Sequence, residues 1–304
     1  LQGKNLVAQR NSESAERALT YFEQAIQLDQ NFAKAYAGMG TAYHSIGLRV
    51  PDRHTSEVKA KEAIKKALEL DSNCADAYAA RGVIGFSYEW DFTSGEKDLI
   101  TAIQLEPNND NAHWGYALLS AYSGQFAKAT TEIETALLIA PGTAMYERDR
   151  GRVLYFSRRY AEATAQLKRA IELKQDLQSS WSWLFRSQEM EGDYAGAYDS
   201  FVKLATLTKN DALESYQRAY ANEGWVGVRK RSIQLAQLNS NPTVYYDLAT
   251  QFVTVGDKEQ AFEYLNKAVD RRSWEVCFLR FDPRLDPLRS DPRFDELVKR
   301  IGYR

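Results

Sequence analysis

The sequence is poor in the residues that stabilise small secreted domains or build metal sites. Among 304 residues there are two cysteines, Cys74 and Cys277, with three histidines and seven prolines. Two thiols so far apart in the chain cannot form a disulfide framework or a cysteine-rich metal cage. No run of about 20 apolar residues is present, so we expect no membrane-spanning helix. The low proline and glycine content also excludes a low-complexity chain.

The charges are nearly balanced, with 39 basic and 41 acidic side chains and a formal net charge of -2. Nucleic acids and anionic membranes attract clustered positive charge, so we expect neither nucleic-acid binding nor membrane insertion. The two lone thiols favour a reducing compartment, which indicates the cytoplasm, with the periplasm as the alternative. Because residue 1 is leucine rather than methionine, we also expect the chain to be a piece of a longer protein.

A short pattern recurs along the chain, as in AIQLDQN at Ala25–Asn31 and AIQLEPN at Ala102–Asn108. Equivalent positions at Ala102, Ala136, Ala170 and Leu204 follow one another at intervals of 34 residues. A helical period of 34 residues is the signature of the tetratricopeptide family, which the sequence resembles. The predicted fold is therefore an all-α, right-handed α-solenoid of about eight helical hairpins over residues 1–272, with a C-terminal capping segment over 273–304.

Each second helix carries a small, a large and a small residue at helical spacing, which places them on one face. Such small residues let the two helices of a hairpin approach closely, and the large residue fills the space opposite. We expect a left-handed residue to end the first helix at Gly47, Gly124, Gly192 and Gly256. The triplets are Ala18/Phe22/Ala25, Ala60/Ile64/Ala67, Gly95/Leu99/Ala102, Ala129/Ile133/Ala136, Ala163/Leu167/Ala170, Ala197/Phe201/Leu204 and Ala261/Leu265/Ala268.

Several repeats depart from this pattern. The first is represented best by its second helix, and the second has a longer turn around Leu48–Thr55, including Pro51. The third carries one extra residue near Tyr88–Phe92, followed by Thr93-x-x-Glu96, which predicts a capping box. The seventh is degenerate around Gly224–Gly227. In the capping segment, Asp282-Pro283 and Asp291-Pro292 each predict an N-cap followed by proline at the first helical position.

A closer resemblance rests on four segments in fixed order. They are FSYEWDF at Phe86–Phe92, the Gly-Trp-x-Gly turn at Gly224–Gly227, GDKEQAFEYLNKAVDRR at Gly256–Arg272 and the double DPR tail. This set resembles the C-terminal repeat region of large bacterial signalling proteins. In those proteins it accompanies a winged-helix DNA-binding domain, a Ser/Thr protein kinase domain or an adenylate cyclase. None of those effector motifs occurs here, so the resemblance implies no catalytic residue and no cofactor.

The remaining candidates for chemistry have structural interpretations. His113 occupies a helix-packing position that holds Trp or Tyr in other repeats, and the three histidines show no metal-ligand spacing. The carboxylates of Glu89 and Asp91 are expected to serve a turn and a helix cap. Gly38-x-Gly40 lies inside a predicted helix with no strand before it, which disfavours a phosphate-binding loop.

In this family the first helices line an inner groove, at positions near two, five, nine and twelve of each repeat. In the early repeats these positions hold Lys34, Thr41, His44, Asp76, Phe86, Asn111 and Trp114. Guanidinium groups bind carboxylates, and aromatic rings and arginine are enriched at binding hot spots. We predict that an extended peptide with acidic and apolar residues, or an acidic C-terminus, binds in this groove. The predicted site residues are Trp114, Tyr122, Arg148, Arg152, Tyr155, Arg186, Glu189, Tyr216 and Tyr220.

The alternative is a solvated face whose arginines pair with acids such as Glu147 and Asp149. If the groove binds a peptide, replacement of Arg148 and Arg152 by glutamate should abolish binding without unfolding. The predicted function is a non-enzymatic interaction and sensing module, without metal or cofactor, whose partner is a protein or peptide. A substrate-recruitment arm of a fused kinase or cyclase and a small-molecule sensor are the alternatives. Nothing in the sequence specifies an oligomeric state.

Overall fold

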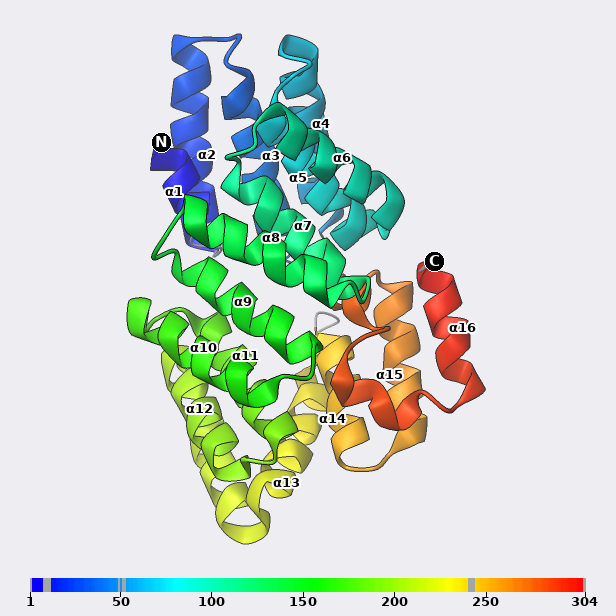
Figure 1. The fold of residues 1–304 in the computed structure, drawn as a ribbon. Helices are drawn as coiled ribbons and strands as arrows, with labels where there is room; N and C mark the ends of the chain where they lie inside the picture. Colours follow the sequence, from blue (N-terminus) through cyan, green and yellow to red (C-terminus); the bar gives the residue numbers. More distant parts are fainter. Residues whose placement is uncertain (1, 8–11, 49, 51–52, 240–243, 303–304) are drawn as a thin grey trace. The chain divides into compact units, whose positions relative to one another are not determined.

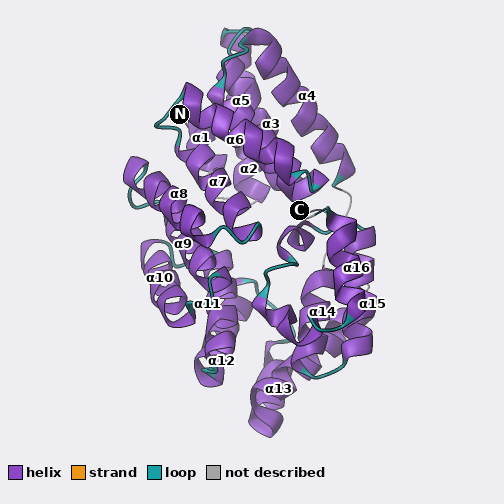
Figure 2. Cartoon of the chain, turned by 45° about the vertical axis from the view of Figure 1, so that its right-hand side comes forward, coloured by secondary structure: helices purple, strands orange, loops and turns teal. Residues whose placement is uncertain are grey.

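The structure is a computed structural model that describes residues 2–7, 12–48, 50, 53–239 and 244–302. Within these ranges the ordered elements are helices, and no strand is present (Figures 1 and 2). Part of the long turn predicted around Leu48–Thr55, including Pro51, lies outside the described residues. The helices are α1 (Gln2–Val7), α2 (Ser12–Leu28), α3 (Ala33–Gly47), α4 (His54–Leu70), α5 (Ala75–Ile84), η1 (Gly85–Glu89), α6 (Phe92–Leu105), α7 (Asp110–Tyr122), α8 (Phe126–Ile139), α9 (Ala144–Phe156), α10 (Tyr160–Leu173), α11 (Gln178–Glu191), α12 (Tyr194–Leu207), α13 (Leu213–Asn239), α14 (Tyr245–Thr254), α15 (Lys258–Asp270), η3 (Trp274–Phe278), η4 (Pro283–Leu288) and α16 (Pro292–Ile301).

The chain divides into two compact units. Unit 1 comprises Leu1–Ser120 and Thr131–Pro141, and unit 2 comprises Ala121–Thr130 and Gly142–Arg304. In unit 1, α3 pairs with α4 and α5 pairs with α6; in unit 2, α9 pairs with α10, α11 with α12, and α14 with α15. These consecutive antiparallel hairpins confirm the predicted all-α solenoid of tetratricopeptide type.

In three hairpins the close approach of the two helices depends on a glycine in the first helix. A Cβ atom added to Gly40, Gly82 or Gly151 would lie within 2.5, 2.8 and 2.6 Å of the Ile64, Leu99 and Leu167 side chains, respectively. Those three large residues are the centres of the predicted triplets, and each is at most 2% exposed. The small–large packing inferred from the sequence is therefore the packing observed.

The turn after the first helix uses the left-handed region in most repeats. Gly124, Gly192 and Gly256 have φ of 76°, 85° and 84°, as predicted. The prediction is wrong for Gly47, which lies inside the last turn of α3, because the lengthened connection continues through Leu48 in a helical conformation. In two repeats a non-glycine residue holds the left-handed position: Trp90 at φ 61° and Arg158 at φ 62°. Both stand 34 residues from Gly124, so the position is periodic even where glycine is absent.

The extra residue of repeat three is absorbed in a π-helix, η1, which ends α5 with a wider turn. A π-helix is the usual form that one inserted residue takes within an α-helix. The predicted capping box at Thr93 and Glu96 is wrong. Asp91 is the N-cap of α6 instead, and its carboxylate accepts a hydrogen bond of 2.9 Å from the Ser94 amide. Asp91 thus has the capping role proposed for the Glu89 and Asp91 pair, whereas Glu89 forms an ion pair with Lys61.

Repeat seven is a single long element, α13, which bends at Gly224 (φ 61°, ψ −149°). The bend places Trp225, 4% exposed, against the rings of Phe185 and Phe201, with ring centroids 6.2 and 6.0 Å away. Trp225 thus joins one apolar cluster with residues of α11 and α12. In the C-terminal segment, Asp282 and Asp291 are N-caps followed by proline, as predicted.

His113 packs in unit 1 as expected, but it also forms an ion pair. Its Nδ1 lies 2.6 Å from the Glu132 carboxylate, and its Nε2 lies 2.9 Å from the Pro107 carbonyl oxygen. The hydrogen bond to Glu132 raises the pKa of His113 above its ordinary value, because it outweighs the opposing effect of burial.

This pair makes the stability of unit 1 dependent on pH. The stabilisation is complete below the unfolded histidine pKa, near ~6.5, and is lost as pH rises through the higher folded value. Urea unfolding between pH 5.5 and 8.5 should therefore show that the free energy of unfolding of the wild type declines as pH rises. The decline should be smaller in a His113→Tyr variant. Equal slopes for the two proteins would contradict this assignment.

Candidate functional site

The inner face of unit 2, made by its first helices, is covered by the protein's own C-terminal segment. Phe278 of η3 is fully buried, and its ring centroid lies 5.3 Å from Tyr122, 5.2 Å from Phe156 and 5.4 Å from Tyr246. These rings come from α7, α9 and α14, which belong to three repeats. Offset and edge-to-face rings at such distances attract each other beyond the area that they bury. The segment containing η3 and η4 therefore occupies the place predicted for a bound peptide.

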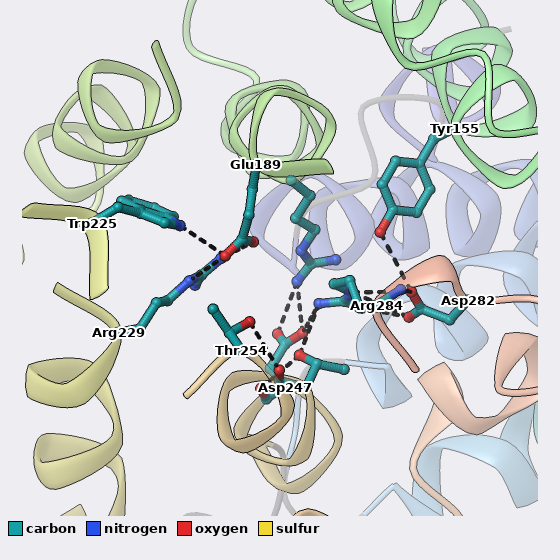
Figure 3. A network of polar contacts seen from close by, with 10 residues as sticks. Tyr155, Glu189, Trp225, Arg229, Asp247, Thr254, Asp282 and Arg284 are labelled. Carbon is teal, nitrogen blue, oxygen red and sulfur yellow. Dashed lines mark hydrogen bonds and ion pairs between the residues drawn. The ribbon is translucent and has the colours of Figure 1, made fainter. Parts of the chain in front are cut away.

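Asp282 fixes the same segment through polar contacts (Figure 3). Its carboxylate is fully buried and accepts a hydrogen bond of 3.4 Å from the Tyr155 hydroxyl. It accepts another, of 3.0 Å, from the Tyr246 hydroxyl. It also accepts a bond of 2.7 Å from the guanidinium of Arg284, which donates in turn to Asp247 at 3.2 Å. A buried carboxylate requires such partners, because burial alone strongly disfavours its charge. The predicted site residue Tyr155 is thus occupied by the chain itself.

Arg148 and Arg152 lie on one face of α9, as predicted, but both are more than nine-tenths buried. Arg148 donates to the fully buried Asp149 at 2.6 and 3.0 Å, and Arg152 donates to it at 2.8 Å. Arg152 also bonds the Tyr122 hydroxyl. The interpretation in which these arginines pair with nearby acids describes this geometry, although the face is buried rather than solvated. Two glutamates placed beside Asp149 would leave three acids together, so we now expect this exchange to destabilise the fold as well.

Arg186 lies one repeat further, on α11. It donates to both carboxylate oxygens of Asp247, at 2.8 and 2.9 Å. The guanidinium carbons of Arg186 and Arg152 lie 4.9 and 4.7 Å from the centroid of Trp183, so both cations contact this indole. The arrangement is a closed network of cations, acids and aromatic rings within unit 2.

Glu189 forms a separate buried cluster with two residues of α13 (Figure 3). Arg229 donates to its carboxylate through two nitrogens, one at 2.9 Å, and the Trp225 indole nitrogen donates at 2.7 Å. Burial alone would raise the pKa of Glu189, but the charge and hydrogen bonds of Arg229 outweigh it and hold that pKa below its usual range. Of the last two predicted residues, Tyr216 is buried against Phe201 and Tyr220 stacks on Tyr198 with centroids 3.5 Å apart.

The inner face of unit 1 is different, because its corresponding positions hold small residues. Ala37, Gly38, Ala79 and Ala80 leave a pocket of about 60 Å³ between α1, α3, α5 and α7. A water molecule needs at least ~10–15 Å³ on this measure, so the pocket has room for about four waters or one compact side chain. Its lining residues are Lys4, Val7, Phe22, Lys34, Ala37, Gly38, Thr41, His44, Asp76, Ala79, Ala80, Val83, Asn111 and Trp114.

Charged side chains surround this pocket without filling it. Asp76 accepts a hydrogen bond of 2.8 Å from the Asn109 amide and lies 3.4 Å from the Lys4 ammonium. Lys34 lies 3.4 Å from Glu106, and both of these side chains are well exposed. Exposed ion pairs of this length contribute little to stability and exchange readily for another partner. The rim therefore has two cations that are available to a ligand.

One wall of the pocket has a polar relay that superficially matches a hydrolase triad. His44 Nδ1 lies 3.0 Å from Glu57, and its Nε2 lies 3.2 Å from the Ser87 hydroxyl. The Ser87 hydroxyl, however, already donates its proton to the Val83 carbonyl at 2.5 Å. His44 must then donate to Ser87 rather than accept from it, which is the reverse of what activates a nucleophile. The relay is therefore structural and connects α3, α4 and η1.

Sequence reasoning placed six of the pocket residues on the inner face: Lys34, Thr41, His44, Asp76, Asn111 and Trp114. Of the nine predicted site residues, the structure places Trp114 in this pocket and Tyr122 and Tyr155 against the C-terminal segment. Arg152 and Arg186 both contact Trp183. Lys4 was missed, because α1 is too short to show the repeat pattern. No other signal in the sequence would have identified it.

Metal sites and membrane-spanning helices are both absent from the described ranges. No group of three or more His, Cys, Asp or Glu side chains is arranged to hold a metal ion there. Among the helices formed by those residues, none is long and apolar enough to cross a membrane.

Comparison with known proteins shows similarity of fold at low sequence identity. No family model and no curated protein matches the sequence. Among solved structures, the Cut9–Hcn1 hetero-tetramer of the APC/C aligns with a TM-score of 0.60 and 14% identity over 95% of this chain and 52% of that chain. The human IFIT1 dimer with PPP-AAAA aligns with a TM-score of 0.53 and 15% identity, over 86% of this chain and 69% of that chain. PilW, a type IV pilus biogenesis factor, aligns with a TM-score of 0.51 and 16% identity, over 67% of this chain and 90% of that chain. These likenesses support the tetratricopeptide-type fold.

Proposed function

We propose that this chain is a non-enzymatic interaction module that binds a partner protein through an extended peptide on the inner face of unit 1. The observation that carries the proposal is the contrast between the two units. On the inner face of unit 2 the C-terminal segment packs against large side chains, whereas in unit 1 Ala37, Gly38, Ala79 and Ala80 line a pocket. An apolar pocket with few, well-placed polar groups is the usual form of a recognition site.

The pocket indicates what the peptide presents. Phe22, Ala80 and Val83 form an apolar floor that suits one aliphatic side chain. Lys4 and Lys34 at the rim suit an acidic group next to that side chain, since their present ion pairs are weak and exposed. Trp114 adds a rigid aromatic wall of the kind that is enriched at binding hot spots. An acidic peptide with an apolar anchor is therefore the favoured partner.

The same module can act within a larger protein. The resemblance of its repeat region to bacterial signalling proteins supports a role in which partner binding regulates an attached effector domain. The alternative is a recruitment arm, which delivers a substrate to an attached enzyme. The two roles differ because in a recruitment arm the attached enzyme modifies the bound partner. A second binding mode uses the peptide contacts predicted for unit 2, with Arg148, Arg152, Tyr155, Arg186, Glu189, Tyr216 and Tyr220. For Tyr155, binding in this mode requires displacement of the segment around Asp282.

The proposal is tested by filling the pocket. Thr41 is half-buried and stands at the repeat position that Arg152 and Arg186 occupy in unit 2, so Thr41→Arg places a long side chain in the pocket. We expect this variant to lose at least about tenfold in affinity for a partner captured by the wild type, as expected when a central contact is lost. Affinity is measured by calorimetry with the purified partner, after circular dichroism has established folding.

Charge variants provide the matched control. Lys34→Glu should weaken binding, more strongly at low salt, whereas Lys66→Glu on the exposed side of α4 should not. Unchanged affinity in both Thr41→Arg and Lys34→Glu would move the binding site away from unit 1. Loss of binding in a Tyr155→Phe variant alone would favour the second mode.

A further inference from the structure

Unit 1 has a second cavity, of about 500 Å³, which is separate from the inner-face pocket and shares no lining residue with it. It lies between α4 on one side and α5 with η1 on the other. Its walls are formed by Lys61, Ile64, Lys65, Leu68, Glu69, Arg81, Ile84 and Glu89.

The cavity exists because repeats two and three pack incompletely. The residue that follows each small–large–small triplet is buried in unit 2, where Ile171, Ala205 and Val269 are at most 8% exposed. Its counterpart on α4, Leu68, is only partly buried. Across the gap, Arg81 stands at the position that Leu184 holds in repeat six. Its guanidinium bonds Asp98 at 2.6 and 2.7 Å, so it leaves the gap open instead of packing on α4.

The walls combine an apolar floor with a rim of charged side chains. Ile64 and Ile84 are each 2% exposed, and with Leu68 they give the cavity a mainly apolar lining. Three cations line the cavity, and each has an acidic partner: Arg81 is bound to Asp98, Lys61 to Glu89 and Lys65 to Glu69. Lys65 is the cation held least tightly, because its ammonium lies 3.8 Å from Glu69 and its side chain is 80% exposed.

We propose that this cavity binds a monoanionic amphiphile, an alkyl carboxylate with its chain on Leu68, Ile64 and Ile84 and its head group at Lys65. The volume lies within the ~300–1,000 Å³ of small-ligand sites. A partner helix, ~10–12 Å across, is too wide for a space of this size. A carboxylate head group can replace the distant Glu69 as the partner of Lys65, whereas a neutral chain leaves Lys65 without a new partner.

The test is isothermal titration of the whole chain with monomeric dodecanoate, with dodecanol and acetate as matched probes. We expect dodecanoate to bind with one-to-one stoichiometry, dodecanol to bind more weakly and acetate not to bind. Lys65→Glu should lower the affinity for dodecanoate by about fivefold, as expected for an exposed charge contact. The neighbouring Lys66→Glu, which does not line the cavity, should leave the affinity within about twofold.

A variant of the floor separates this site from general apolar adsorption. Leu68→Trp narrows the cavity and should abolish binding while the circular dichroism spectrum is retained. Equal losses in Lys65→Glu and Lys66→Glu, or undiminished binding in Leu68→Trp, would overturn the proposal. Thr41→Arg should bind dodecanoate normally, so the result is independent of the peptide pocket.

Discussion

Replacement of Phe278 by alanine is expected to destabilise unit 2 by about 3–5 kcal/mol, the usual cost of removing a fully buried phenylalanine. For a unit of this size that corresponds to a fall in melting temperature of roughly 10 °C. The ring is completely buried and lies within 5.2–5.6 Å of the ring centroids of Tyr122, Phe156, Tyr246 and Trp274. Its removal leaves a cavity whose walls come from several repeats, so relaxation of any one helix cannot close it.

Differential scanning calorimetry of the whole chain measures this effect. A matched control is Leu238→Ala, because Leu238 is 78% exposed and its loss should change stability by less than about 0.5 kcal/mol. A loss below about 1 kcal/mol for Phe278→Ala would mean that the C-terminal segment is not held on the inner face as described.

Replacement of Arg229 by methionine should cost about 3–5 kcal/mol at neutral pH, because it leaves the Glu189 carboxylate buried without its main counter-charge. Both side chains are 7% exposed. The loss should be measured by urea unfolding, with the exposed Lys230→Met on the same helix as control. Lys230 pairs with the exposed Glu223, so its replacement should have little effect.

The effect of Arg229→Met should depend on pH with a definite sign. In the wild type the pKa of Glu189 is lowered, so its stabilisation is present above the unfolded pKa and is lost as pH falls through the folded value. Without Arg229, burial raises the pKa of Glu189, and the protonated acid is tolerated at low pH. The difference in the free energy of unfolding between variant and wild type should therefore become smaller from pH 7 towards pH 4. A difference that is constant over this range would exclude an electrostatic origin.

The sequence predicted the hairpins and their packing, because local physics decides both. The small–large–small triplets, the left-handed glycines at 124, 192 and 256, and the Asp-Pro caps at 282 and 291 all follow from helix geometry within a few residues. The errors at Gly47 and Thr93 have a common cause. Each lies next to an insertion, and a pattern read from regular repeats does not show how extra residues are accommodated.

The site was harder to predict because it depends on contacts between distant residues. Pairing of Arg148 with Asp149 was one of the alternatives offered by the sequence. Only the fold shows that Asp282 contacts Tyr155 and that Asp247 contacts Arg186. A periodic pattern specifies which face a side chain is on. It contains no information about whether another part of the chain covers that face. The pocket of unit 1 was accessible to prediction in part, since alanine and glycine at inner positions already imply a hollow.

The position of the C-terminal segment on the inner face of unit 2 has a consequence for the order of folding. In a stack where each repeat contacts only its neighbours, folding can begin anywhere and spread. Unit 2 instead joins Tyr155 to Asp282 and Arg158 to Asp286, partners 127 and 128 residues apart. At ~5–20 residues per second of synthesis, Tyr155 emerges from a ribosome roughly 6–25 s before its partner. Until the segment around Phe278 is synthesised, Phe156 and then Trp183 lack the ring that covers them in the folded unit, so we expect this aromatic surface to attract chaperones during synthesis.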